Sequence, residues 1–182
     1  MSVLLSSWGC ESGNWYSGNC VTTPGATFNV PLTFTIYAES SPGIAGAVLA
    51  QQTQTFNILY RPSASTLCTS GKWYNSKDKT CYNGFPQTIK MTFSGVGVTL
   101  PSQVIWSVAY NTTHAGFIPI GESATCYASA GGCGYDSLNV GAKSFPNAPY
   151  VGTDTNEDQA FRNGFMESGW TGYRPLGAIV TK

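Results

Sequence analysis

Charged residues are scarce in this chain of 182 residues: they make up 10% of it, and nine basic residues balance nine acidic ones. A nucleic-acid-binding domain carries a basic patch or stripe, so this composition argues against a nucleic-acid partner. No apolar run approaches the ~18 residues of a membrane helix, and we therefore expect no membrane span. With 42% apolar residues the chain is nevertheless too hydrophobic to be disordered.

The familiar catalytic motifs are missing as well. The sequence has no GxSxG elbow, no phosphate-binding glycine loop and no HExxH, and any catalytic triad would have to use its single histidine, His114. A glycosidase needs only two carboxylates, which Glu122 and Asp136 could supply, but carboxylates among Gly and Ser commonly organise a turn instead. We therefore predict a protein that is not an enzyme, with glycoside hydrolysis by Glu122 and Asp136 as an alternative.

Thr, Tyr, Phe and Val are abundant, whereas the helix-forming residues Glu, Lys, Arg and Leu are few. This balance predicts an all-β protein. The length suits one domain, residues 1–182, with a substantial core. The N-terminus has neither the basic segment nor the apolar run of a signal peptide, and we expect the natural protein to begin upstream of Met1.

Alternation of apolar and polar residues predicts the main strands. Residues 28–39 alternate clearly and, through the turn SPG, lead to a second strand at 47–60, which together form a long hairpin. Pro31 favours an edge or a bulge, because it lacks a donor for the ladder. Residues 104–110 are large on one face and mostly apolar on the other, so we expect this strand at the centre of a two-sheet sandwich.

Six cysteines form three couples that are close in sequence, and each couple brackets a loop rich in Gly, Ser and Asn. CxxC spacing is absent, which favours disulfides over a zinc site. We predict pairing in sequence order and an oxidising, extracellular setting. The expected disulfides are Cys10–Cys20, Cys68–Cys81 and Cys126–Cys133.

Several segments are similar to a group of secreted bacterial proteins, namely YRPSAS, GKWYNSKDKTCYNGFPQTIKMTFSGVGVTLP and GESATCYASAGGCGYDSLNVG. The hairpin with its PG turn, VLA run and TQTFNI resembles that of jelly-roll domains of the laminin-G-like or carbohydrate-binding-module kind. The resemblance covers residues 8–141. It implies a two-sheet antiparallel β-sandwich of jelly-roll type and brings no established activity.

A sugar site combines flat aromatic side chains with short polar groups. The long loop after residues 104–110 has both and is clasped by a cysteine couple, so we expect the binding site there. Trp15 and Tyr16, at the tip of the first disulfide loop, form a second set, although they could equally cap the core. The candidates are His114, Glu122, Tyr127, Tyr135 and Asp136, with Trp15 and Tyr16.

A hard cation is the one cofactor that the sequence suggests. Asp154, Asn156 and Asp158 place oxygen ligands at alternate positions, but the following residues do not match an EF-hand. Only an irregular structural calcium site is compatible with them, and the alternative is a solvated turn. Asn111 begins a glycosylation sequon, which matters only in a glycosylating host.

The leading hypothesis is therefore a secreted binding domain for a glycan or other cell-surface polymer. Loops rich in Tyr and Trp equally suit contact with protein. The rival hypothesis is a structural or adhesive subunit of an extracellular layer or fibre, which would associate with itself.

Overall fold

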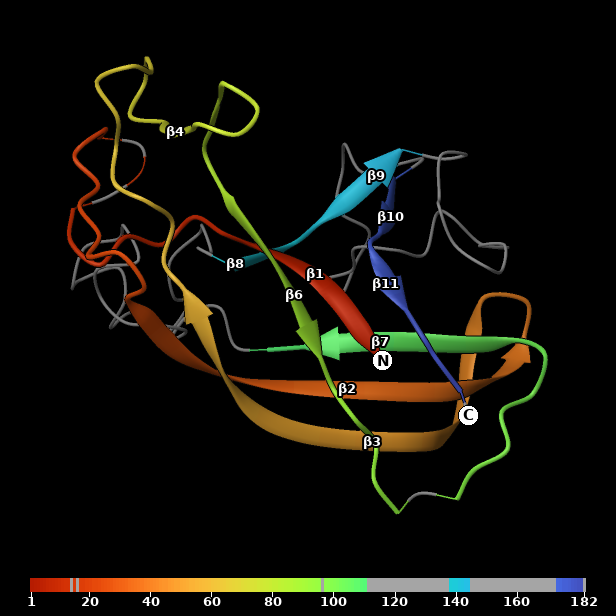
Figure 1. Ribbon diagram of the computed structural model, residues 1–182. Helices are drawn as coiled ribbons and strands as arrows, with labels where there is room; N and C mark the ends of the chain where they lie inside the picture. The colour runs from red at the N-terminus through yellow and green to blue at the C-terminus, as the bar shows by residue number, and fades with distance from the viewer. Residues whose placement is uncertain (14, 16, 96, 111–137, 145–172, 182) are drawn as a thin grey trace, which may run out of the picture.

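The computed structural model of the protein describes residues 1–13, 15, 17–95, 97–110, 138–144 and 173–181 (Figure 1). In these ranges all regular structure is strand, all strand pairs are antiparallel, and there is no helix, so the all-β prediction is confirmed. The strands are β1 (Ser2–Ser7), β2 (Thr27–Ser41), β3 (Ile44–Leu59), β4 (Trp73–Asn75), β5 (Thr80–Tyr82), β6 (Phe85–Lys90), β7 (Val104–Ala109), β8 (Leu138–Val140), β9 (Ala142–Ser144), β10 (Tyr173–Pro175) and β11 (Gly177–Ala178).

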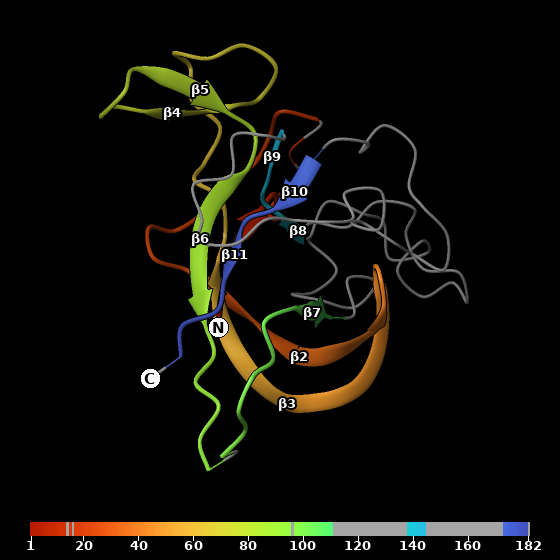
Figure 2. The same cartoon turned by 90° about the vertical axis from the view of Figure 1, so that its right-hand side faces the viewer.

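The β2–β3 hairpin is the largest element, and Figure 2 shows that it is strongly curved. Its turn is Pro42-Gly43, in which Gly43 has φ 74°, as position i+2 of a type II turn requires. Gly43 N donates to Glu39 Oε1 at 2.6 Å, which fixes the turn from inside the strand. The predicted hairpin is thus confirmed, with β3 beginning at Ile44.

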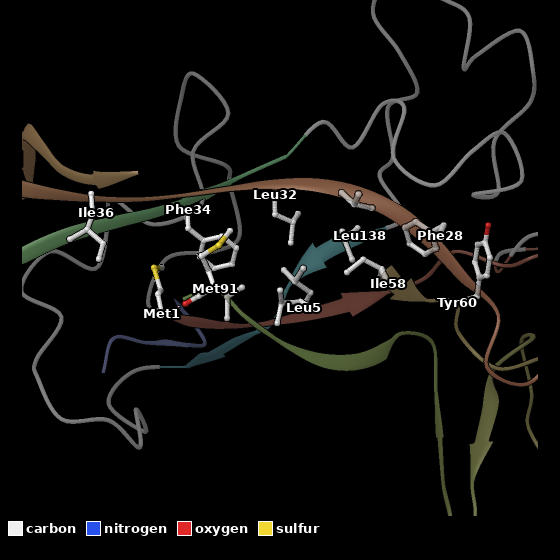
Figure 3. Close-up of a cluster of buried hydrophobic side chains, with 14 residues drawn as sticks. Met1, Leu5, Phe28, Leu32, Phe34, Ile36, Ile58, Tyr60, Met91 and Leu138 are labelled. Carbon is white, nitrogen blue, oxygen red and sulfur yellow. Dashed lines mark hydrogen bonds between the residues drawn. The ribbon is translucent and has the colours of Figure 1, made fainter. Parts of the chain in front are cut away.

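In β2 the side chains alternate as the sequence predicts. Phe28, Val30, Leu32, Phe34 and Ile36 are all buried, because period-two alternation places them on one face of the pleated strand. Figure 3 shows Leu32 and Phe34 directed from β2 toward Leu5 and Met91 of the opposite layer.

A three-stranded sheet has the order β3-β2-β7, so β2 is its central strand. Among the described residues β7 pairs with β2 alone, from Thr33 to Ala38 on β2, and it lies at the edge of the sheet. Within the described residues, 104–110 therefore do not occupy the central position that the sequence predicted. Val104, Trp106 and Val108 pack against the core while only half-buried: an apolar run alone does not distinguish an edge strand from a covered one.

The opposite sheet is built around β1. Its whole length pairs with β6, while β8 and β11 share its other side. Val3, Leu5 and Ser7 of β1 are fully buried, whereas Leu4 and Ser6 are half-buried on the outward face. The two sheets enclose the core cluster, which comprises Met1, Val3, Leu5, Phe28, Val30, Leu32, Phe34, Ile36, Ala50, Ile58, Tyr60, Ile89, Met91 and Leu138.

Backbone hydrogen bonds also fill the gap between β8 and β11, along the edge of β1 that faces away from β6. Gly141 N donates to Leu4 O at 2.8 Å, and Leu4 N donates to Leu176 O at 2.7 Å. A Cβ on Gly141 would come within 2.9 Å of the Leu4 side chain, so a glycine is needed for this close approach. Beyond Gly141 the chain leaves the sheet as β9 and pairs with β10.

Candidate functional site

Two disulfides lie in the described residues, Cys10–Cys20 and Cys68–Cys81, with Cα–Cα distances of 5.4 and 5.8 Å. Their pairing in sequence order is confirmed. Cys126 and Cys133 fall outside the described residues, so their pairing stays a prediction. We refer to residues 8–24 and 60–86, which contain the two described disulfides, as the disulfide end of the molecule.

The two disulfide loops meet through glycines. Gly18 and Gly71 have φ of 71° and 65°, and a Cβ on Gly71 would overlap the Cα of Gly18. Beneath this contact lies Arg61, which is fully buried and donates through Nη2 to Gly71 O at 2.5 Å. Arg61 N donates to Gly9 O at 2.9 Å. Arg61 thus bridges the two loops, because its backbone N–H donates next to the first disulfide while its buried guanidinium donates to a carbonyl of the second disulfide region.

The β4–β5 hairpin, which we call the arm, projects away from the two sheets in Figure 2. Trp73 is only 7% exposed, and its Nε1 donates to Gly84 O at 2.9 Å. The Tyr82 and Phe85 rings each lie 5.5 Å from that of Trp73. The Trp73 ring therefore forms the small core of the arm, and it is not a surface platform.

Asp78 organises the tip of the arm and orients Tyr82. Its carboxylate accepts from Thr80 N at 3.1 Å and from the Tyr82 hydroxyl at 2.8 Å. The latter bond raises the pKa of Tyr82, because it is made only by the protonated phenol. The Tyr82 ring is consequently held in one direction while remaining 39% exposed.

Between the arm and the outward face of β1 lies a depression of about 470 Å³. Gly84 forms part of its wall, and a Cβ there would overlap the Ser6 hydroxyl and the Trp8 indole nitrogen. The Trp8 ring also packs edge-on against the Trp15 ring, with 4.7 Å between the ring centroids and 89° between the ring planes. The residues lining the depression are Leu4, Ser6, Trp8, Lys72, Cys81, Tyr82, Asn83, Gly84, Pro86, Gly141 and Leu176.

The depression combines flat aromatic surface with polar groups. Trp8 and Tyr82 bring flat aromatic surface, and Ser6, Lys72 and Asn83 bring short or cationic polar groups to the same depression. Aromatic faces pack on the C–H surface of a ring, while a few polar groups fix its orientation. Both aromatics are oriented by neighbours, so little side-chain freedom would be lost on binding.

Of the residues predicted for ligand binding, the structure describes Trp15 alone. Trp15 is half-buried and its ring packs against that of Trp8, which lines the depression. The other predicted site residues lie outside the described residues: Tyr16, His114, Glu122, Tyr127, Tyr135 and Asp136 for ligand, Asp154, Asn156 and Asp158 for calcium, and the sequon at Asn111.

The structure does describe both ends of the long predicted binding loop. The Tyr110 hydroxyl donates to Leu138 O at 3.0 Å, which joins the residues on either side of 111–137. Leu138 pairs with Ser7 of β1, and Ser7 directly precedes Trp8. The predicted loop therefore starts and ends beside the strand that leads into the depression.

Four residues that line the depression were not predicted from the sequence as ligand-binding residues, namely Trp8, Lys72, Tyr82 and Asn83. Trp8 and Tyr82 are far apart in sequence, and they come together only because Gly84, just after the arm, lies against Ser6 and Trp8. A weak signal was available in the segment TCYNG, where an aromatic and an amide follow a cysteine directly and precede a glycine.

Among the described residues no group of three or more His, Cys, Asp or Glu side chains is placed to hold a metal ion. Within the same ranges there is no apolar helix of membrane-spanning length. Comparison of this chain with protein-family models, curated proteins and solved structures found no match. The function is therefore argued from the geometry of the site.

Proposed function

We propose that the protein is a non-catalytic, extracellular binding domain that recognises carbohydrate, and that the depression between the arm and β1 is part of its binding surface. The observation that carries this proposal is the joint presence of Trp8 and Tyr82, both oriented by neighbours, with Ser6, Lys72 and Asn83 around one depression. A jelly-roll arrangement of the two antiparallel sheets belongs to the same proposal, as the sequence resemblance implies.

Secretion is supported by the two disulfides, which persist in oxidising compartments. Both disulfides hold parts of the depression: Cys81 lines it and precedes Tyr82, and Cys10 lies two residues after Trp8. Covalent closure of these loops limits their freedom before a ligand arrives, which favours affinity.

The predicted ligand residues between 111 and 137 also belong to this proposal, because the described residues that flank them, Tyr110 and Leu138, are joined beside β1. His114, Glu122, Tyr127, Tyr135 and Asp136 would then act with Trp8 and Tyr82. A calcium ion at Asp154, Asn156 and Asp158 would have a structural role.

The first experiment is a glycan array on the disulfide-intact chain, followed by titration of the strongest glycan. Tyr82→Ala should weaken binding more than tenfold, which is about 1.4 kcal/mol, because it removes exposed aromatic surface from the depression. Asn83→Ala should act in the same direction through a lost polar contact.

Tyr74→Ala is the matched control. Tyr74 is opposite Cys81 in the β4–β5 register and so lies on the other face of the arm from Tyr82, which is opposite Trp73. The Tyr74→Ala variant should bind the glycan with the affinity of the parent, and its melting temperature should be similar to that of the Tyr82→Ala variant. Absence of any bound glycan, or equal loss of affinity in Tyr74→Ala and Tyr82→Ala, would contradict the proposal.

A structural or adhesive subunit is the second candidate function. One observation favours it: strand β3 is long and carries no charged residue.

A further inference from the structure

Strand β3 presents a free edge. It pairs with β2 on one side, and on its other side no described strand pairs with it (Figure 1). From Thr27↔Leu59 to Ile36↔Ala50 the β2–β3 register runs without a shift, and all register shifts lie nearer the turn. The regular part of the edge thus extends over Ala50–Leu59.

The Gln87 side chain reveals which backbone groups point outward along this edge. Its Oε1 accepts from Leu59 N at 2.9 Å, and its Nε2 donates to Leu59 O at 3.0 Å. Gln87 is in β6 of the other sheet, so the backbone N–H and C=O of Leu59 face away from β2. In an antiparallel ladder these directions alternate from residue to residue, so the same holds for Asn57, Thr55, Thr53 and Gln51.

Pro31 supports this parity independently. It pairs with Thr55, and since proline has no N–H it suits a pair that exchanges no hydrogen bonds. Thr33 and Thr53 form another such pair, and their hydroxyl oxygens lie 2.8 Å apart, consistent with the closer side chains of non-hydrogen-bonded positions.

The β3 edge lacks the usual protection against pairing. Natural sheets guard their edges with charged residues, prolines or bulges, yet the segment from Ile44 to Leu59 contains no charged residue and no proline. The residues Gln51, Thr53, Gln54, Thr55 and Asn57 are all exposed. Among the residues that the structure describes, the Gln87 amide alone covers this part of the edge, at Leu59.

We infer that the β3 edge from Gln51 to Asn57 is a self-association surface, at which a second copy of the chain pairs antiparallel about a two-fold axis through Gln54. The outward residues then face one another as hydrogen-bonded pairs, Gln51 with Asn57 and Thr53 with Thr55. The two three-stranded sheets join into one continuous sheet.

A second copy suits this edge because two-fold pairing sets the strand against itself. A charged residue on the axis would face the same charge of the other copy, which is destabilising directly across strands, and β3 carries no charged residue. Gln54 would face the Gln54 of the other copy, and amide side chains can both donate and accept. The inference is independent of carbohydrate binding, because the depression lies on the outward face of the other sheet.

The experiment measures solution mass by light scattering or sedimentation from about 1 μM to about 1 mM protein. The disulfide-intact chain should dimerise with rising concentration. Gln54→Lys should abolish association by placing two ammonium groups opposite each other, and Thr55→Pro should do so by removing an outward N–H. An equimolar mixture of Gln54→Lys and Gln54→Glu chains should associate again.

Two further variants test the register. In a non-hydrogen-bonded pair the Cα atoms lie about 4.5 Å apart, within the range for a disulfide, so Gln54→Cys should form a cross-linked dimer on oxidation. Gln52→Cys should not, because the two introduced thiols would be offset by about 13 Å along the strands. Ala109→Lys, on the exposed edge strand β7, is the control and should leave association unchanged.

A chain that stays monomeric at about 1 mM would overturn the inference. So would association that survives both Gln54→Lys and Thr55→Pro, or that is lost in Ala109→Lys alone, since the contact would then lie elsewhere. Each variant should keep its melting temperature within a few degrees of the parent, which separates lost pairing from lost folding.

Discussion

The two-sheet core and the disulfide end are stabilised in different ways. In the core, large side chains such as Leu5 and Phe34 are fully buried between two sheets, and the stabilisation comes from apolar area removed from water. At the disulfide end the chain approaches itself too closely for a side chain at Gly71, whose Cβ would overlap Gly18. There the structure depends on disulfides and on carbonyl contacts of one buried guanidinium, Arg61.

The candidate site lies where the two-sheet core meets the disulfide end, and each region contributes one of its aromatic side chains. Trp8 follows directly from β1 of the core, while Tyr82 belongs to the arm of the disulfide end. A cross-linked arm with a small aromatic core can keep Tyr82 exposed without help from the main core. A binding surface can thus vary in its loops while β1 retains its place between β6 and β8.

The largest effect is expected in the core. Phe34→Ala should lower the free energy of unfolding by about 3–5 kcal/mol, because Phe34 is fully buried on the central strand β2. Urea unfolding followed by tryptophan fluorescence measures the change. Val48→Ala is the control: Val48 is 54% exposed on β3, and its loss should cost less than about 0.5 kcal/mol. Similar losses in the two variants would refute the placement of the core.

Removing the second disulfide should have an intermediate effect confined to the disulfide end. The double variant Cys68→Ser with Cys81→Ser opens a loop of sequence separation 13 and should cost about 3 kcal/mol in the chain-entropy model. Hydrogen exchange should show loss of protection in β4 and β5 while β2 remains protected at native conditions. Equal loss of protection in β2 and the arm would show that the two regions unfold as one.

The smallest effect concerns Tyr60, which lies where the regions join, next to Arg61 and 4.8 Å from the Phe28 ring. Burial raises the pKa of Tyr60 to about 12, and the negative charge of Glu11 adds to the rise. An unfolded chain releases this proton near pH 10. Between pH 10 and 12 the unfolded state therefore binds fewer protons than the folded state, and the free energy of unfolding falls as pH rises.

Tyr60→Phe removes this titration. We expect the difference in unfolding free energy between parent and variant to be constant below pH 9 and to shift by about 1 kcal/mol against the parent by pH 12. Urea unfolding at a series of pH values measures it. Parallel pH profiles would mean that Tyr60 ionises in the folded protein as easily as in the unfolded chain.

Some features of this protein follow from the sequence alone, for local reasons. Alternation in residues 28–36 determines which face of β2 is buried, because successive side chains of a strand point to opposite faces. The Pro42-Gly43 turn is specified by its own two residues. The pairs Cys10–Cys20 and Cys68–Cys81 are close in sequence, and each closes a short loop that brings its cysteines together.

Other features were decided only by the tertiary structure, because they depend on contacts between distant segments. Residues 104–110 have the composition of a covered strand, yet the partners available to β7 in the described residues place it at the edge of the sheet. The depression exists because Gly84, which follows β5, lies against Ser6 and Trp8 at the end of β1, and this approach brings Trp8 and Tyr82 to the same place. The outward groups of the β3 edge could not be identified until strand pairing and the Gln87 contact fixed their direction, since an uncharged strand of this composition fits a sheet interior equally well.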